Sequence, residues 1–335
     1  MRIGLSYDLK ETVPLEHEPP EDALEEYDCP ETVDAIASAL ETEGHSVVRL
    51  GGGREFLTKI LQHSVDLVFN IAEGRGNYRS REAQVPAVLE MLGIPYSGAD
   101  PQCLANCLDK PLTKKILSLS GIATPRWQVV SHIQQLEETT WGGFPFPAFV
   151  KPAHEGSSKG THFASRVENT PQMVKVVADL LKRYQQPVMV EKFVAGDEVT
   201  VGVVGNSPPA VLGIMRILPK RKEAYFFYSI EVKREWEHMV DYECPAQLGA
   251  RVIHRIIDYS LEAFKVLGCR DFARIDFRLS PEGVPYFLEI NPLPGLNPKS
   301  SDLPIMAIKM GWTYQALISA ILSSALRRYP QCVPG

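Results

Sequence analysis

The residues best suited to chemistry lie in one stretch, residues 268–301, which reads GCRDFARIDFRLSPEGVPYFLEINPLPGLNPKSS. Its first half alternates apolar and polar residues, which predicts a β-strand with Arg274 and Asp276 on one face. A Ser-Pro-Glu-Gly turn follows, and the returning strand has Glu289 and Asn291 on one face. If this hairpin pairs the polar faces, two carboxylates, an amide and a guanidinium converge.

Two carboxylates and an amide oxygen suit a hard cation such as Mg²⁺, with Mn²⁺ as a substitute, completed by water and nucleotide phosphates. Arg274 can clamp a phosphate or a carboxylate through two parallel hydrogen bonds. A salt-bridged hairpin without a ligand is the competing interpretation. The Asn-Pro-Leu-Pro-Gly sequence that follows favours a site, because it ends the strand in a rigid loop that presents Lys299 and Ser300.

A second polar segment lies in the middle of the chain. A buried strand ends at Lys151, and the glycine- and serine-rich turn 154–160 follows it. Backbone N–H groups and hydroxyls of such a turn can cradle phosphates, although most Gly-Ser turns bind nothing, and the GKS/T ending of a Walker loop is absent. Two further strands meet near residues 192–198, where backbone around Lys192 and Val194 can read a planar base and Glu198 can accept from ribose hydroxyls.

The N-terminal part of the chain alternates strands and helices, which predicts a small parallel α/β domain. Ligands of such sheets bind beyond the carboxyl ends of the strands, and Glu73 and Arg75 follow the third strand. The acidic segment Lys10 to Asp28 is either a lid over a site or a solvated loop. We expect three domains, at residues 1–100, 101–200 and 201–335.

The composition of the chain excludes several classes of function. The chain has 335 residues, 44% of them hydrophobic, and a net charge of −6 with scattered Lys and Arg, which argues against nucleic-acid binding. Six unevenly spaced cysteines predict no disulfide framework, and Cys103 and Cys107 lack the partners of a zinc set. No signal-peptide pattern and no membrane-length apolar run is present, so we expect a cytoplasmic protein without a membrane partner.

The segments ARIDFRL and YFLEINPLPG resemble the metal-binding end of the ATP-grasp fold, in particular its D-alanine–D-alanine ligase branch. The resemblance extends over nearly the whole chain. It implies a mixed α/β and α+β architecture in which two α+β modules hold ATP behind an N-terminal parallel α/β domain. It also implies a homodimer formed through that N-terminal domain, with small amino acids or carboxylic acids as substrates.

The resemblance also implies roles for individual residues. Lys110, Lys151 and Lys233 match the lysines that touch ATP phosphates, and Gly156, Ser157 and Ser158 match the mobile loop above them. Glu191, Lys192, Val194 and Glu198 match the adenine and ribose positions, and Asp276, Glu289 and Asn291 match the Mg²⁺ ligands. The groups that stabilise the tetrahedral intermediate and hold the second substrate's carboxylate are matched by Arg274, Gly295 and Ser300. The residues predicted to be catalytic are Arg274, Gly295, Ser157 and Lys233.

The departures from the family pattern concern the amino acids rather than ATP. The family's Gly-Gly-x-Ser-x-Glu segment is replaced by residues 6–11, and its histidine before Gly-Arg-Gly is Glu73. Near the second substrate, Pro292-Leu293 replaces Thr-Ser and Lys299 replaces a histidine. The resemblance implies a carboxylate–amine ligase that forms an acyl phosphate, and the changes predict that its first substrate is another amino acid or a similar acid. Glu73 and Arg75 predict an extra cationic or hydroxyl group on that substrate, and the retained Arg274 and Ser300 predict an α-carboxylate on the second.

Three other interpretations stay open at this point. The protein can be a D-alanine–D-alanine ligase whose first substrate site has diverged. It can use the same acyl phosphate to close a ring within one substrate. It can also be a nucleotide-binding regulatory protein without turnover, although the complete set of acids, amide, arginine and lysines argues against this.

Overall fold

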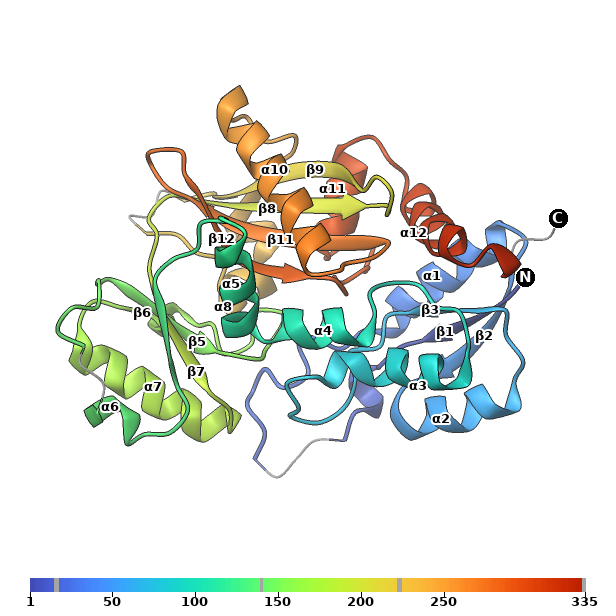
Figure 1. Ribbon diagram of the computed structural model, residues 1–335, viewed down its shortest axis with the longest axis horizontal. Coiled ribbons are helices and arrows are strands. Elements are labelled where there is room, and N and C mark those ends of the chain that lie inside the picture. The colour runs from blue at the N-terminus through green and yellow to red at the C-terminus, as the bar shows by residue number, and fades with distance from the viewer. Residues whose placement is uncertain (15–17, 139–140, 222–224, 333–335) are drawn as a thin grey trace.

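The computed structural model describes residues 1–14, 18–138, 141–221 and 225–332, which form three sheets with helices packed around them (Figure 1). The first sheet is parallel, with strand order β2-β1-β3, as the strand–helix alternation predicts. Its elements are β1 (Arg2–Ser6), β2 (Ser46–Gly51), β3 (Leu67–Asn70), α1 (Pro30–Thr42), α2 (Gly53–Gln62), α3 (Gln84–Leu92) and the 3₁₀ turns η1 (Lys10–Thr12) and η2 (Arg81–Ala83).

The second sheet is antiparallel, has strand order β4-β7-β5-β6 and lies at the lower left of Figure 1. Helix α7 covers it, and Met173, Val177 and Leu180 of that helix join Val150 and Val190 of the sheet in one buried cluster. Its elements are β4 (Trp127–Val130), α6 (Gln135–Glu138), β5 (Ala148–Pro152), η3 (Phe163–Ser165), β6 (Arg166–Val167), α7 (Thr170–Tyr184) and β7 (Val188–Lys192).

The third sheet is antiparallel with strand order β10-β9-β8-β11-β12. Its strands are β8 (Asp197–Val204), β9 (Ala210–Pro219), β10 (Val240–Glu243), β11 (Phe272–Leu279) and β12 (Pro285–Asn291). The helices associated with it are α4 (Pro101–Leu108), α5 (Lys110–Leu119), α8 (Ile230–Arg234), α9 (Trp236–Met239), α10 (Ala250–Val266), α11 (Asp302–Lys309) and α12 (Tyr314–Arg328), and η4 (Pro330–Cys332) ends the described chain.

The alternation in β11 sorts its side chains between the two faces of the third sheet. Ile275 and Phe277 pack into the same buried cluster as residues of α4, α5 and α10. Arg274 and Asp276 therefore point to the opposite face, as the sequence pattern predicts. Helices α4 and α5 precede the second sheet in the chain but pack on the third sheet. The domain limits expected at residues 100 and 200 stay predictions.

Helix α12 returns the chain to the N-terminal module, where it packs on α1 in a shared apolar cluster. Within the described ranges, no single helix has the length and apolar character needed to cross a membrane. Helices α11 and α12 meet those criteria only when joined, and they are bent by 112° relative to each other.

Candidate active site

The hairpin β11–β12 forms with the predicted polar face. Asp276 is the register partner of Glu289, and Arg274 is the register partner of Asn291. The Arg274 guanidinium donates from Nε to Asp276 Oδ1 at 3.0 Å and from its terminal nitrogen to Oδ2 at 2.8 Å. Thr200 of the neighbouring strand donates to Asp276 Oδ1 at 2.7 Å. The hairpin thus gathers an arginine, two carboxylates and an amide into one oriented group.

The oxygen atoms of this group fit a hard divalent cation. The side-chain amide of Asn291 donates from Nδ2 to Asp276 Oδ2 at 3.3 Å, which leaves the side-chain oxygen Oδ1 of Asn291 for another partner. Lys110 Nζ lies 3.3 Å from Glu289 Oε2. Burial alone would raise the pKa of Glu289, but the charges of Lys110 and nearby cations outweigh burial and lower that pKa to about 2. Glu289 is therefore ionised at neutral pH, as a Mg²⁺ ligand must be.

A cleft between the second and third sheets, the central cleft, contains most of the residues predicted for ATP and metal. Phe149 and Phe227 contribute apolar surface to it, which suits a planar base. Glu198 accepts two hydrogen bonds on Oε1, from the Tyr228 N–H and from Arg278, so Oε2 stays available for a ligand. The predicted residues that line the cleft are Lys110, Lys151, Ser157, Ser158, Glu198, Lys233, Arg274, Asp276 and Glu289.

The glycine- and serine-rich turn has an unusual backbone at its centre. Ser157 and Ser158 both have positive φ values, 48° and 60°, which residues with side chains seldom adopt. Such conformations cost free energy and recur at ligand-binding turns, where the surrounding structure holds them in place. Here Ser158 Oγ donates to the Tyr228 carbonyl at 3.3 Å, which links the turn to the segment before α8.

A second pocket, the inner pocket, lies between this turn and the loop that follows β12. It is lined by Glu26, Glu73, Glu82, Cys107, Leu108, Lys110, Glu155, Gly156, Ser157, Arg274 and residues 290–295. Burial, reinforced by Glu82, raises the pKa of Glu73 well above its ordinary value. Burial raises the pKa of Glu82 to about 7. Across the described chain, neither Glu73 nor Glu82 forms a salt bridge, whereas Glu26 is bound by Arg81 and Lys159.

The turn that carries Glu73 packs closely on the 3₁₀ turn that carries Glu82, and Gly74 makes this contact possible. Gly74 has a φ of 82°, and a Cβ atom at this position would lie 2.0 Å from the Arg81 carbonyl oxygen. Its N–H donates to the buried Asp8 at 2.9 Å. Only glycine permits this close contact between backbone segments, which brings the turn after β3 against η2.

A third pocket, the outer pocket, opens on the other side of Arg274. Its lining includes Lys233, Gly295, Ser300 and Asp302, together with Lys10 and residues 25–29 of the acidic segment. Ser157 and Arg274 are the two residues that line the central cleft, the inner pocket and the outer pocket alike. The three spaces therefore meet at these two side chains.

The acidic segment packs on the glycine- and serine-rich turn. Asp22 accepts from the Gly160 N–H at 2.8 Å and from the Tyr184 hydroxyl. Glu26 accepts from Arg81 and from Lys159, and all three side chains are buried. Of the two interpretations offered by the sequence, these contacts support a segment that covers a site; residues 15–17 within it lie outside the described residues.

Four predicted residues have surroundings that the sequence did not indicate. The Glu191 carboxylate is buried between Lys114 at 3.0 Å and Lys151 at 2.8 Å, so its side chain does not face the central cleft. Arg75 pairs with the buried Asp8 at 2.9 Å instead of entering the inner pocket. The side chains of Lys192 and Lys299 are exposed, and neither residue lines the three pockets.

Two positioning residues were not anticipated. Arg278 donates to the carbonyls of Val194 and Gly196 and to Glu198, and thereby fixes the turn between β7 and β8. It shares the predicted polar face of β11 with Arg274 and Asp276, which was the signal available in the sequence. Lys114 is fully buried against Glu191, and no local pattern in α5 indicates a buried lysine.

Two antiparallel sheets that enclose a lysine- and carboxylate-lined cleft, behind a parallel α/β module, define the ATP-grasp class. Comparisons with known proteins support the same class. The family model described as "D-ala D-ala ligase C-terminus" matches residues 116–323. The D-alanine–D-alanine ligase of Aquifex aeolicus is 35% identical over 86% of this chain and 92% of its own length. An uncharacterised protein, y4sG, of Sinorhizobium fredii is 33% identical over 88% of each chain.

A solved structure supports the same assignment. The D-alanine–D-alanine ligase of Bacillus anthracis complexed with ATP superposes with a TM-score of 0.76 over 99% of both chains, at 26% identity. The chain belongs to the D-alanine–D-alanine ligase family, and it is an ATP-grasp ligase that forms carbon–nitrogen bonds.

Proposed function

We propose that this enzyme joins two amino acids, or an amino acid and a similar acid, through an acyl phosphate made from ATP. The observation that supports this most directly is the meeting of three pockets at Ser157 and Arg274. A reaction of three substrates requires such a junction, because the γ-phosphorus must reach an oxygen of the carboxylate and the attacking amine must reach the carbon of the same group.

In the first step, a carboxylate oxygen of the acid in the inner pocket attacks the γ-phosphorus of ATP in the central cleft. A new P–O bond forms, the bond to the β,γ-bridging oxygen breaks, and ADP leaves. Lys110, Lys151 and Lys233 line the cleft and can offset the charge of the transferring phosphoryl group. Mg²⁺ held by Asp276, Glu289 and Asn291 would add to this neutralisation.

In the second step, the amine nitrogen of the substrate in the outer pocket attacks the acyl carbon. A C–N bond forms, the bond from carbon to the phosphate oxygen breaks, and inorganic phosphate leaves with the proton released by the amine. The Arg274 guanidinium and the Gly295 N–H can stabilise the oxyanion of the tetrahedral intermediate. The packed acidic segment and the turn at Ser157 exclude water, which would otherwise hydrolyse the acyl phosphate.

The inner pocket indicates the chemistry of the first substrate. Glu73 and Glu82 both line this pocket without a salt-bridge partner among the described residues, and the charge of Glu82 adds to the burial that raises the pKa of Glu73. A substrate ammonium group would relieve this repulsion. We infer that the first substrate is an amino acid whose α-amino group, or a second amino group, binds between Glu73 and Glu82.

The outer pocket indicates the second substrate. Arg274, Lys233 and Ser300 line it, and together they present two cationic groups and one hydroxyl. These groups suit an α-carboxylate. Arg234 and Glu25, which are paired at 2.6 Å, form the rim of the same pocket and can contact a polar side chain of that substrate.

A panel assay tests the proposal. The purified enzyme is incubated with Mg²⁺-ATP and single or paired amino acids of both configurations, and ADP release and product masses are recorded. We expect ADP release with a pair whose first member is an amino acid, and a product equal to the sum of both masses minus one water.

D-Alanine must be in the panel, because the Aquifex aeolicus relative is a D-alanine–D-alanine ligase. Formation of D-alanyl-D-alanine alone would identify a D-alanine–D-alanine ligase with a diverged first substrate site. A product that lacks one water relative to a single substrate would identify ring closure instead. ATP binding without ADP release for any acid would contradict the proposal.

A further inference from the structure

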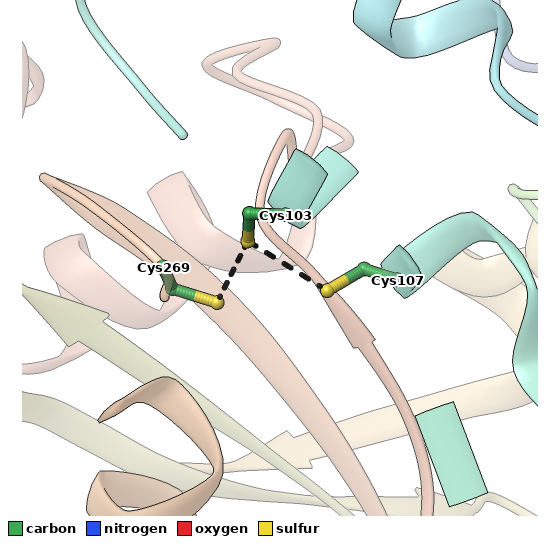
Figure 2. Close-up of side chains that lie close together, drawn as sticks. All are labelled: Cys103, Cys107 and Cys269. Carbon is green, nitrogen blue, oxygen red and sulfur yellow. Dashed lines mark hydrogen bonds between the residues drawn. The ribbon is translucent and has the colours of Figure 1, made fainter. Parts of the chain in front are cut away.

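Behind the inner pocket, three cysteine side chains from two distant parts of the chain converge (Figure 2). Cys103 and Cys107 lie one turn apart on α4, and Cys269 lies between α10 and β11. The Cys103 sulfur is 3.8 Å from that of Cys107 and 3.6 Å from that of Cys269. All three sulfur atoms lie within 4.8 Å of one another. The i, i+4 spacing of the first two was visible in the sequence, but the third is 162 positions further along.

The surroundings of these sulfurs are apolar. The three side chains are 1%, 3% and 7% exposed and belong to the buried cluster between the third sheet and α4, α5 and α10. All three are free thiols. The remaining cysteines, Cys29, Cys244 and Cys332, are only partly buried and lie outside this cluster.

We propose that Cys103, Cys107 and Cys269 form a three-coordinate binding site for a soft, thiophilic metal ion of the monovalent copper class. Sulfur ligands select soft ions, among them Cu⁺ and Zn²⁺. Zn²⁺ in closed protein sites takes four ligands, whereas the donors gathered here from the described residues number three. Coordination number therefore favours an ion that is satisfied by three sulfurs.

The spacing of the sulfurs is compatible with a shared ion. Three sulfurs at a metal–sulfur distance of about 2.3 Å in one plane stand about 4.0 Å from each other. The observed separations of 3.6 Å and 3.8 Å are close to this value, so an ion requires only small side-chain movements. Cys103 lies between the other two sulfurs and contacts both (Figure 2).

Binding exchanges protons for a metal ion. Cysteine ligates metal as the thiolate, so each sulfur that binds Cu⁺ releases its thiol proton to solvent. The positive ion then offsets part of the thiolate charge in this apolar site, where burying charge is costly. No electron is transferred, so the step needs neither an oxidant nor a reductant.

An ion can reach this cluster. Cys107 lines the inner pocket, and Cys269 lines a surface groove formed with residues of α10 and the turn between β8 and β9. A bound ion would connect α4, which carries part of the inner pocket, to the start of β11, which carries Arg274 and Asp276. The inference does not depend on the proposed function, because it concerns binding alone.

The test is anaerobic titration of the reduced, metal-free full-length protein with Cu⁺ in competition with a chromophoric Cu⁺ chelator. We expect one Cu⁺ to be withdrawn from the chelator per chain, with an ultraviolet thiolate-to-copper charge-transfer band. X-ray absorption should show sulfur-only coordination by three atoms. Thermal unfolding should shift upward with Cu⁺, because the ion binds the folded state.

Cys103→Ser and Cys269→Ser should each weaken Cu⁺ binding at least tenfold, whereas the matched variants Cys244→Ser and Cys332→Ser should leave it unchanged. Wild-type protein that fails to compete for Cu⁺ would overturn the proposal even if no variant folds. Binding that persists in Cys269→Ser, or Zn²⁺ binding in preference to Cu⁺, would also overturn it. So would wild-type protein that loses two hydrogens to a disulfide on mild oxidation while binding no copper.

Discussion

Asp276 and Glu289 are direct register partners across β11 and β12, yet their electrostatic surroundings differ. Asp276 is held by Arg274 on one side and by Thr200 on the other. Glu289 faces Lys110 and keeps an ionised carboxylate, because the nearby cations lower its pKa to about 2. The pair therefore offers one carboxylate held by two hydrogen-bonding neighbours and one that faces a lysine, an arrangement that can hold a cation against nucleotide phosphates.

Glu289→Gln should abolish ADP release in the presence of the active substrate pair. The change keeps the shape of the side chain but removes the negative charge that would hold Mg²⁺. Charge stabilisation by such an ion contributes several kcal/mol, so we expect kcat to fall about 1000-fold or more. Chelation of divalent metal by EDTA should have the same effect on the wild type, reversed by Mg²⁺. Glu282→Gln, in the exposed turn of the same hairpin, is the control; unchanged ADP release in Glu289→Gln would contradict the metal assignment.

Arg274→Lys should lower kcat about 100-fold to 1000-fold, with a smaller effect on the KM for ATP. A lysine retains one positive charge but cannot bond Asp276 through two nitrogens and still present a further N–H to the three-pocket junction. Steady-state kinetics with each substrate varied in turn would measure the effect. Arg270→Lys, close to the start of the same strand but paired with Asp100, is the matched control. Equal losses in both variants would show that Arg274 acts only through folding.

The affinity for the first substrate should increase as pH rises through about 7. Burial raises the pKa of Glu82 to about 7; among its neighbours, Arg81 and Lys110 lower that pKa, whereas Glu26 and Cys103 raise it. An ammonium group binds the ionised carboxylates, so KM for the first substrate should fall between about pH 6 and about pH 8. In Glu82→Gln this dependence should weaken and KM at the higher pH should rise. A KM profile that is identical in the variant would contradict the role of Glu82.

The same carboxylate makes a separate prediction for the ligand-free enzyme. Because the folded-state pKa of Glu82 is raised, its contribution to stability is present below the unfolded value of about 4.3 and is lost as pH rises through about 7. Glu82→Gln removes the ionisable carboxyl group, and with it the loss of stability between these pH values. The variant should therefore gain melting temperature relative to the wild type at about pH 8 and not at about pH 4. A uniform shift at both pH values would indicate a packing effect instead.

The parts of the site that are local in sequence could be predicted. Strict alternation in β11 placed Arg274 and Asp276 on one face, because successive side chains of a strand point to opposite sides of the sheet. Their pairing with Asn291 and Glu289 also depends on a shift of the hairpin register by one residue between Asp276 and Phe277, which the sequence did not indicate. The parallel N-terminal sheet followed from strand and helix spacing in the same way.

The parts that depend on distant contacts could not be predicted. Glu191 is in a strand at the expected place, but the buried Lys114 from α5 captures its carboxylate. Arg75 turns to Asp8, which is 67 positions earlier in the sequence. Cys269 lies beside Cys103 and Cys107 of α4, and the spacing of those two residues did not indicate a third cysteine. Each outcome is decided by which side chain from elsewhere satisfies a buried charge or fills a buried space, and no local period encodes that choice.

The last prediction concerns the buried ionic network that ties the acidic segment to the turn above the central cleft. Arg81, only 1% exposed, donates to Glu26 at 2.6 Å, to Glu155 at 3.1 Å and to the His154 carbonyl at 2.9 Å. Arg81→Met should lower the free energy of unfolding by about 3 to 5 kcal/mol, because it leaves two buried carboxylates with Lys159 as their remaining cation. Urea unfolding of the ligand-free enzyme would measure this.

Arg79→Met is the matched control, because Arg79 is two residues away, is largely exposed and makes only a 3.7 Å pair with Asp109. It should cost less than about 1 kcal/mol. Adding Glu26→Leu to Arg81→Met should recover part of the loss, since one uncompensated carboxylate is removed while the pair of Lys159 and Glu155 at 2.6 Å remains. Equal losses in the free energy of unfolding for Arg81→Met and Arg79→Met would show that the network does not hold the acidic segment in place. A loss in the double variant that exceeds the sum of the losses in Arg81→Met and Glu26→Leu would show the same.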